Sequence, residues 1–469
     1  MSSAAQRALD RLPAHKRELA RLLTARAVGT APDAAATPDG PVPRAGGGPV
    51  PATLTQARLW RYARSSDPAV GTGSHAIRLR GPLDAARLRD ALTTVLRRHE
   101  ALRTHLTERP DGSLMQVVAA EPELSLRELD LTGVVDQAAE VARQVTDSAL
   151  TPLDLAAGQS SAFRLLRLAD DHHVLVLAAH LAVFDGWSSG VFLADLAAAY
   201  RGVAATEQPT VQFPDFADWQ HQWLLGPEGQ REVAYWHKEL AGLRPAEAAS
   251  ERFVRGHLPV GLDVQVTRPA FAASAAHGAT PFMALLAALA VVLAHRTGNE
   301  DIVIGTPTAG RAAPGLETAI GQFTTVVPIR VDCSGGPSFA ELLRRTRIAV
   351  ARSLAHGSLP VDALFGAGGV PPYSVLFALH NYPSIPLDLP AIDVEQVPGP
   401  PARHLELYSP APDATLACIG LVERDGRITG TAEFNRAMAS PTDVRALMAG
   451  IEKVLYRAAS LPSGAPVAL

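Results

Sequence analysis

The residues best suited to chemistry lie in one stretch, from His173 to Gly190. An apolar run rich in Val and Leu ends at His180, and five residues later Asp185 precedes a glycine. This pattern predicts a buried strand that delivers polar groups to its own end. An imidazole accepts a proton near neutral pH, and a carboxylate orients or pairs with charged groups. The stretch therefore predicts a catalytic loop in which His180 and Asp185 are candidate catalytic residues.

The elements that position this loop belong to a chain of 469 residues, which is long enough for two lobes plus a tail. Hydrophobic residues make up 47% and charged residues 19%, as in soluble globular proteins, and the net charge of −4 gives no reason to expect nucleic acid. Only Cys333 and Cys418 are present, too few for a disulfide framework or a zinc site. The longest apolar run, 282–294, is shorter than a membrane helix. We expect a cytoplasmic protein with no bound metal and no membrane partner.

Patterns along the chain alternate between helical and strand periodicity, which predicts an α/β fold. Residues 1–30 carry an amphipathic pattern and are expected to form a linker helix or a docking helix for a synthase subunit. Residues 31–50 are rich in Ala, Pro and Gly and predict a linker. The folded part is divided into an N-terminal lobe, 51–225, and a C-terminal lobe, 226–469. Residues 383–401 are punctuated by prolines and predict a long surface connection.

Six further stretches resemble, in the same order, the core motifs of nonribosomal peptide synthetase condensation domains. They are residues 51–60, 98–104, 213–220, 305–311, 320–330 and 373–381. The family's signature is two histidines, three residues, then Asp-Gly, and the stretch from His180 to Gly186 is similar to it. The chain is therefore identified as a member of this family, with an atypical signature in which Leu181 takes the place of the second histidine.

The resemblance implies two lobes of the chloramphenicol-acetyltransferase type, arranged as a V-shaped pseudo-dimer with a tunnel between them. Donor and acceptor carrier proteins would deliver phosphopantetheine arms into the tunnel, and the domain itself would bind no cofactor. In the family the signature aspartate pairs with the arginine of the Pro-x-Arg motif, which implies an ion pair between Asp185 and Arg330. The expected tunnel residues are Leu181, Gly186, Trp187 and Ser188.

The leucine at position 181 removes the imidazole that the family places beside the attacking group. Losing a general base costs about 10² to 10⁴ in rate, so a base-dependent reaction would be crippled. A neutral amine is already nucleophilic, and amide formation would suffer less than ester formation. His180 is an alternative base, but alternation along a strand places it on the opposite side from Leu181, which favours a structural role. The pair His172 and His173 is expected in a turn and has no Asp-Gly at the right interval.

Two threonines form a second departure from the family pattern. Thr324 and Thr325 replace the usual Val-Asn and resemble a motif of heterocyclisation domains, whose signature also has leucine in the second place. A threonine hydroxyl could orient a tetrahedral intermediate, so both are candidate catalytic residues. The alternative is that they are ordinary strand residues.

Three functions remain open at this point. The first is amide-forming acyl transfer between carrier proteins in nonribosomal peptide or hybrid polyketide biosynthesis, which makes the chain an acyltransferase. The second is a non-catalytic module that docks or gates carrier proteins or recruits another enzyme. The third is a dehydrating or heterocyclising variant. The sequence favours an enzyme over the non-catalytic module.

Overall fold

The computed structural model describes residues 40–65, 68–203, 209–366, 368–380, 387–400 and 403–460. The expected N-terminal helix, residues 1–30, and residues 31–39 of the expected linker lie outside these residues. The chain separates into two compact units, the first formed by residues 1–231, 311–324 and 382–402 and the second by 232–310, 325–381 and 403–469. The predicted boundary after residue 225 instead falls within the first unit, which also includes two segments from the C-terminal half of the chain.

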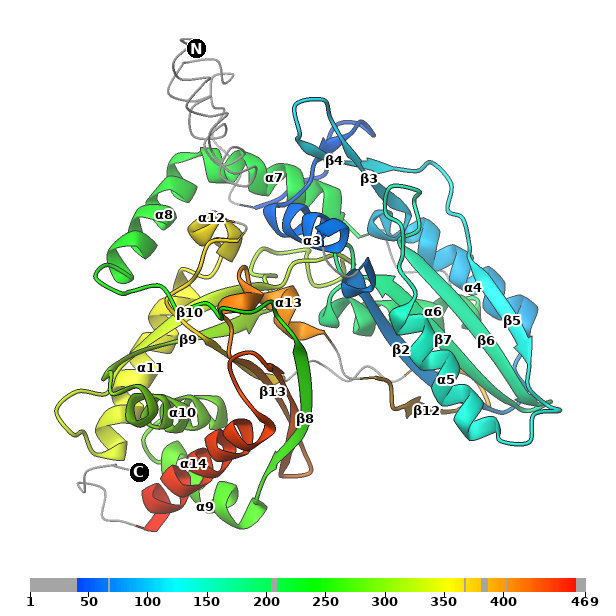
Figure 1. Ribbon diagram of the computed structural model, residues 1–469. Helices are drawn as coiled ribbons and strands as arrows, with labels where there is room; N and C mark the ends of the chain where they lie inside the picture. The colour runs from blue at the N-terminus through cyan, green and yellow to red at the C-terminus, as the bar shows by residue number, and fades with distance from the viewer. Residues whose placement is uncertain are drawn as a thin grey trace, which may run out of the picture. The chain divides into compact units, whose positions relative to one another are not determined.

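The first unit contains a five-stranded sheet in the order β12-β2-β7-β6-β5 and a three-stranded sheet in the order β1-β4-β3. Strand β7 is antiparallel to both β2 and β6, which lie on either side of it in Figure 1. The strands are β1 (Val50–Pro51), β2 (Thr72–Arg80), β3 (Thr104–Glu108), β4 (Leu114–Val118), β5 (Leu126–Asp130), β6 (Ser161–Ala169), β7 (His172–His180) and β12 (Asp393–Val397). The helices are α3 (Leu54–Ser65), α4 (Ala85–Arg98), α5 (Gln137–Leu150), α6 (Gly186–Arg201) and α7 (Phe213–Leu225).

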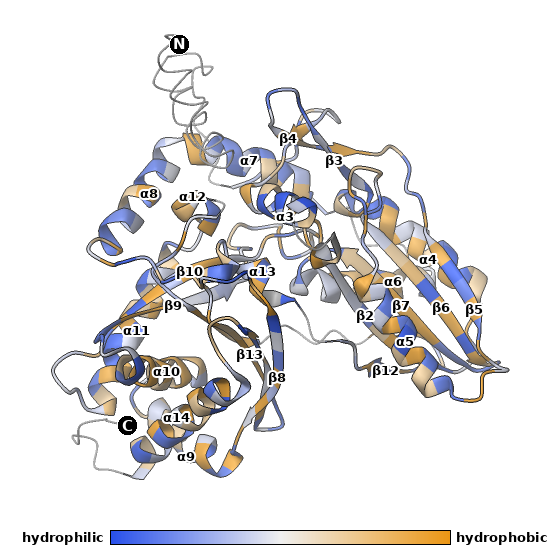
Figure 2. Cartoon of the chain, in the orientation of Figure 1, coloured by the Kyte–Doolittle hydropathy of each residue, from blue (hydrophilic) through white to orange (hydrophobic). Residues whose placement is uncertain are grey.

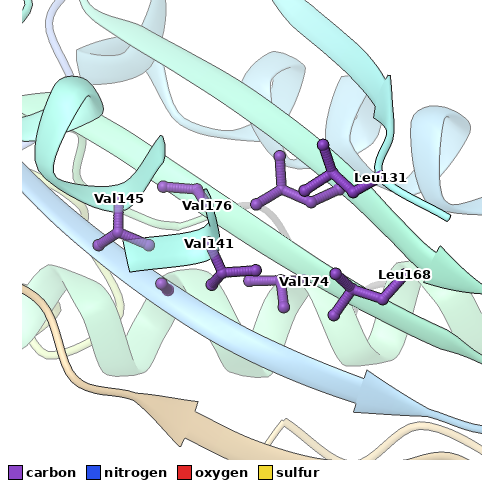
Figure 3. Close-up of a cluster of buried hydrophobic side chains, with 8 residues drawn as sticks. Leu131, Val141, Val145, Leu168, Val174 and Val176 are labelled. Atoms are coloured by element: carbon purple, nitrogen blue, oxygen red, sulfur yellow. The ribbon is translucent and has the colours of Figure 1, made fainter. Parts of the chain in front are cut away.

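Both faces of the five-stranded sheet are covered, which explains why β7 reads as one continuous apolar run. On one face, Val141 and Val145 of α5 pack against Val174 and Val176 of β7 (Figure 3). On the other face, Phe163 of β6 stacks on Phe192 of α6 with ring centroids 5.9 Å apart. The core of this unit therefore fixes the end of β7 and the start of α6, between which the signature loop lies.

Helix α8 (Pro227–Glu239) carries the chain from the first unit into the second, which contains a six-stranded mixed sheet in the order β10-β9-β11-β13-β14-β8. Its strands are β8 (Arg255–Leu262), β9 (Asp301–Thr308), β10 (Thr325–Asp332), β11 (Val375–His380), β13 (Ala417–Arg424) and β14 (Arg427–Asn435). The helices are α9 (Val264–Ala275), α10 (Pro281–Thr297), α11 (Phe339–Ala355), α12 (Val361–Phe365), α13 (His404–Tyr408) and α14 (Pro441–Ser460).

Helix α10 is the central helix of the second unit and is apolar over most of its length (Figure 2). It is buried from Ala284 to Leu293, as expected for a helix without a polar face. Thr280 caps its start, and Gly298 ends it with a left-handed φ of 69°. No helix in the described parts of the chain is long and apolar enough to cross a membrane.

The mixed α/β fold predicted from the sequence is confirmed. Residues 383–401, predicted as a long surface connection, also include strand β12, which was not predicted and pairs antiparallel with β2. Strand β12 is short and mostly exposed at the edge of its sheet, so it carries little of the apolar alternation that identifies a strand.

Candidate functional site

The signature loop ends where Asp185 caps helix α6. Asp185 has an extended backbone, and its carboxylate accepts a hydrogen bond of 2.9 Å from the Ser188 N–H. The helix therefore begins at Gly186, and it ends at Arg201, where Gly202 caps it with φ of 69°. Two of the expected tunnel residues, Gly186 and Trp187, thus belong to the first helical turn.

The carboxylate of Asp185 is held by Arg311, in a pair that lies entirely within the first unit. Arg311 Nη1 donates to Oδ2 at 2.6 Å and Nη2 donates to Oδ1 at 3.0 Å. The Phe323 N–H and the Thr324 hydroxyl also donate to Oδ2, at 3.2 and 3.4 Å. The side chains of Asp185 and Arg311 are 0% and 3% exposed, so this is a buried ion pair with its hydrogen-bonding groups engaged.

The expected pair between Asp185 and Arg330 was wrong. Arg330 donates to both carboxylate oxygens of Asp301, at 2.9 and 2.7 Å, and to the Glu239 carbonyl. Strand pairing explains why Arg330 bonds to Asp301. Strands β9 and β10 are neighbours, and Asp301 pairs with Asp332, two residues after Arg330 on β10. Arg311, at the end of the motif that begins at Gly305, supplies the cation for Asp185.

Ser188 and Trp187 extend the contacts of this ion pair. The Ser188 hydroxyl lies 2.8 Å from Asp185 Oδ1 and accepts a hydrogen bond of 3.1 Å from the Gly321 N–H. The Trp187 indole N–H donates to the Glu317 carbonyl at 2.9 Å. Both contacts tie the first turn of α6 to residues 311–324. We call the set Asp185, Ser188, Arg311 and residues 317–324 the loop clasp.

The two threonines bond to different partners. The Thr324 hydroxyl donates to Asp185 within the loop clasp. The Thr325 hydroxyl accepts a hydrogen bond of 3.1 Å from the Val361 N–H in the second unit. Both side chains are buried, and both hydroxyls contribute to the scaffold. These contacts favour the structural interpretation of the threonines over a role in cyclisation.

His180 is a buried, neutral histidine. Its Nδ1 accepts a hydrogen bond of 3.1 Å from the Ala182 N–H, which places the ring proton on Nε2. Burial lowers the pKa of His180 to about 4. A methyl group on Gly71 would lie 2.3 Å from Nε2, so the ring packs directly against that glycine. A base with a pKa this low, whose Nδ1 lone pair already accepts a hydrogen bond, is poorly suited to accept a proton at pH 7.

Leu181 lies on the other side of the strand end. Its N–H donates to the Gly71 carbonyl at 2.6 Å, and its Cδ2 lies 3.2 Å from the position that a Cβ would take on Gly73. Leu181 is half-buried, whereas His180 is buried. The first unit therefore presents a hydrocarbon side chain at the position where the family signature has an imidazole.

The interpretation of His172 and His173 as turn residues was wrong. The turn is confined to Asp170 and Asp171, and both histidines begin strand β7. His180 ends the same strand, about 25 Å away along an extended backbone. The two histidines are therefore at the far end of the strand from the signature loop.

A second imidazole near the loop, His75, did not emerge from the sequence motifs. His75 lies on β2, and its Nε2 is 3.1 Å from the Ser189 hydroxyl in the first turn of α6. Burial lowers its pKa. The sequence holds one clue to His75. It is a polar residue on the same strand face as Ile77 and Leu79, which are both apolar.

Metal or thiol chemistry has no evident site in the described residues. No group of three His, Cys, Asp or Glu side chains there is arranged to hold a metal ion. Burial raises the pKa of the Cys333 thiol to about 11 and raises that of Cys418 as well, so both are poor nucleophiles at neutral pH.

Comparison with known proteins identifies the family. The condensation-domain family profile matches residues 48–384, and the chain belongs to this family. It is 31% identical over 421 residues to malpinin synthetase of Mortierella alpina, covering 84% of this chain and 5% of that protein. It is 32% identical over 440 residues to phosphinothricin tripeptide synthetase PhsC of Streptomyces viridochromogenes, covering 88% of this chain and 39% of that protein. The chain thus spans less than half the length of these relatives.

Solved structures with the same fold include X-domains and condensation domains. The X-domain from teicoplanin biosynthesis superposes with a TM-score of 0.77 at 26% identity, covering 90% of this chain and 97% of that one. An X-domain in complex with OxyB, also from teicoplanin biosynthesis, gives 0.75 at 25% identity, covering 91% and 96%. The first condensation domain of the calcium-dependent antibiotic synthetase gives 0.71 at 22% identity, covering 89% and 98%. These likenesses confirm the two-lobed, chloramphenicol-acetyltransferase-like fold class.

Proposed function

We propose that this chain catalyses condensation-type acyl transfer, forming an amide between substrates carried on donor and acceptor carrier proteins. The observation that supports this proposal is the loop clasp, in which the buried Asp185 carboxylate pairs with Arg311 and holds the start of α6. A buried ion pair of this kind is costly to maintain unless its geometry is complete. The signature loop has therefore kept its full scaffold although residue 181 is leucine.

The reaction proceeds by attack of an amine nitrogen on the carbonyl carbon of a donor thioester. A C–N bond forms, the C–S bond breaks, and the proton lost by nitrogen ends on the departing sulfur. Phosphopantetheine arms of the carrier proteins supply both reactants, and alignment of the two can lower the barrier by about 7 to 11 kcal/mol. A hydroxyl acceptor needs more help, because it must lose its proton as it attacks. Amide formation is accordingly the reaction best matched to Leu181.

A second candidate is a recruitment module without acyl transfer. Two observations favour it: the pKa of His180 is lowered to about 4, and the chain is similar to an X-domain that forms a complex with OxyB. In this candidate function the clasp preserves only the shape of the fold, and the surface binds a carrier protein or a tailoring enzyme.

An intact-mass assay with two acceptors tests the proposal. Purified donor carrier, loaded with an acyl thioester, is mixed with acceptor carrier bearing either an aminoacyl group or its hydroxy analogue. We expect acyl transfer to the amine, with transfer to the hydroxyl at least about ten-fold slower. Transfer to neither acceptor, together with binding of the carriers, would favour the recruitment module instead.

A further inference from the structure

Strand β2 brings His75 to the same side of the sheet as Leu181. In the antiparallel pairing with β7, Gly73 lies opposite Ala179 and His75 lies opposite Leu177. Leu181 Cδ2 lies over Gly73, two residues before His75. Residues two apart on a strand face the same way and are separated by about 7 Å. An imidazole is therefore one strand repeat away from the leucine that replaces the signature histidine.

His75 is paired with a hydroxyl that the loop clasp fixes in place. Ser189 follows Ser188 in the first turn of α6, and its Oγ is 3.1 Å from His75 Nε2. His75 and Ser189 are both half-buried, whereas Ala76 and Ser188 beside them are buried. The pair thus keeps accessible surface, whereas Ala76 and Ser188, next to it in the sequence, have almost none.

We propose that His75 and Ser189 form the proton-handling pair of this site and take the role that Leu181 cannot fill. This inference rests on the proposed acyl transfer. As the amine nitrogen attacks the thioester carbon, its proton passes to Ser189 Oγ while the Ser189 proton passes to His75 Nε2. When the C–S bond breaks, the same two groups return the proton to the departing sulfur, leaving an amide, a thiol and the neutral pair.

The surroundings of His75 suit this role better than those of His180. The groups that face His75 are Leu177 across the strand, the Phe184 ring at 6.3 Å and the Ser189 hydroxyl, and none of these is charged at neutral pH. Burial lowers the pKa of His75, as it does for His180, and keeps the ring neutral. What distinguishes His75 is the hydroxyl that lies 3.1 Å from its Nε2. A base and a hydroxyl within about 2.6 to 3.2 Å also have the spacing needed for proton transfer.

Single-turnover rates of four proteins test the pair. The variants are His75→Phe, which keeps a ring against Phe184, Ser189→Ala, and His277→Gln as a control at an exposed histidine. We expect His75→Phe to slow amide formation about 10² to 10³-fold, with a smaller loss for Ser189→Ala and none for the control. In the wild type the rate should fall as pH drops through the imidazole pKa, and this step should be absent in His75→Phe. Equal rates in wild type and His75→Phe would overturn the inference and leave the proposed function standing.

A binding measurement keeps the inference testable without turnover. Protein labelled with ¹⁵N-histidine is titrated with a non-hydrolysable acyl-pantetheine amide, and the His75 ring signal is assigned by its loss in His75→Phe. We expect this signal to shift and the His277 signal to stay in place. A His75 signal that does not move while the analogue binds would overturn the inference. A wild type that binds the analogue but never transfers an acyl group would overturn both proposals.

Discussion

Arg311 and Asp185 are joined by two hydrogen bonds, of 2.6 and 3.0 Å, across 126 positions of the sequence. This contact draws residues 311–324 into the first unit and fixes the first turn of α6. The signature loop is thus held by a segment from the second half of the chain, and its shape depends on an arginine that precedes the Pro-x-Arg motif.

Removal of Arg311 should destabilise the fold far more than removal of Arg330. The variant Arg311→Met leaves the Asp185 carboxylate buried without its cation, which costs about 3 to 5 kcal/mol of unfolding free energy. The side chains of Arg330 and Asp301 are 30% and 40% exposed, so Arg330→Met should cost only about 0 to 1 kcal/mol. Urea unfolding of the two variants measures the difference. Equal losses would mean that Arg311 is not the main partner of Asp185.

Gly71 is required because the His180 ring occupies the space beside its Cα. A Cβ there would lie 2.3 Å from Nε2, so Gly71→Ala should destabilise the protein by about 1 to 3 kcal/mol through overpacking. In the double variant Gly71→Ala with His180→Ala, the smaller side chain makes room for the added methyl. We therefore expect the double variant to be more stable than the sum of the two single losses predicts. Additive losses would show that the ring and the glycine are not in contact.

Acidification should destabilise the protein through His180. The pKa of His180 is lowered to about 4 in the fold, against 6.5 for an ordinary histidine, so the unfolded chain binds a proton first as pH falls. Stability is therefore lost between about pH 6.5 and pH 4, with His180 contributing about 2 kcal/mol of loss between pH 7.5 and pH 5. Urea unfolding at these two pH values should show a smaller difference in His180→Gln than in wild type. An unchanged difference would contradict the buried, neutral state of this ring.

The sequence predicted the elements with strong local patterns and missed what depends on tertiary contacts. Helix α10 and strand β7 are continuous apolar runs bounded by caps or turns, and both were predictable. The partner of Asp185 was not predictable from the sequence. Arg311 and Arg330 each lie at the end of a family motif, and only the fold shows which of the two reaches the loop. Strand β12 was missed since its pairing partner, β2, is more than 300 residues earlier in the chain.

The sequence predicted how the residues of the signature loop are placed, but it did not predict that His75 lies near them. Alternation along a strand placed His180 and Leu181 on opposite sides, and the structure agrees. The register of β2 against β7, which brings His75 to the side of Leu181, has no local signal in the sequence. A histidine within an apolar strand face was the available clue, and on its own it also fits an ordinary structural histidine.

The central claim is that the natural loop, with leucine at position 181, still transfers an acyl group. The most direct measurement is a quenched-flow intact-mass assay that compares wild type with Leu181→His, using the same loaded donor and aminoacyl acceptor carriers. Residue 181 packs over Gly73, where an added Cβ would lie 3.2 Å from Leu181 Cδ2, so only a residue without a side chain borders it there. The account predicts amide product from the wild type, with a rate that Leu181→His changes by less than about ten-fold because the proton is handled elsewhere. No product from the wild type, but product from Leu181→His, would show that the natural domain is a disabled transferase.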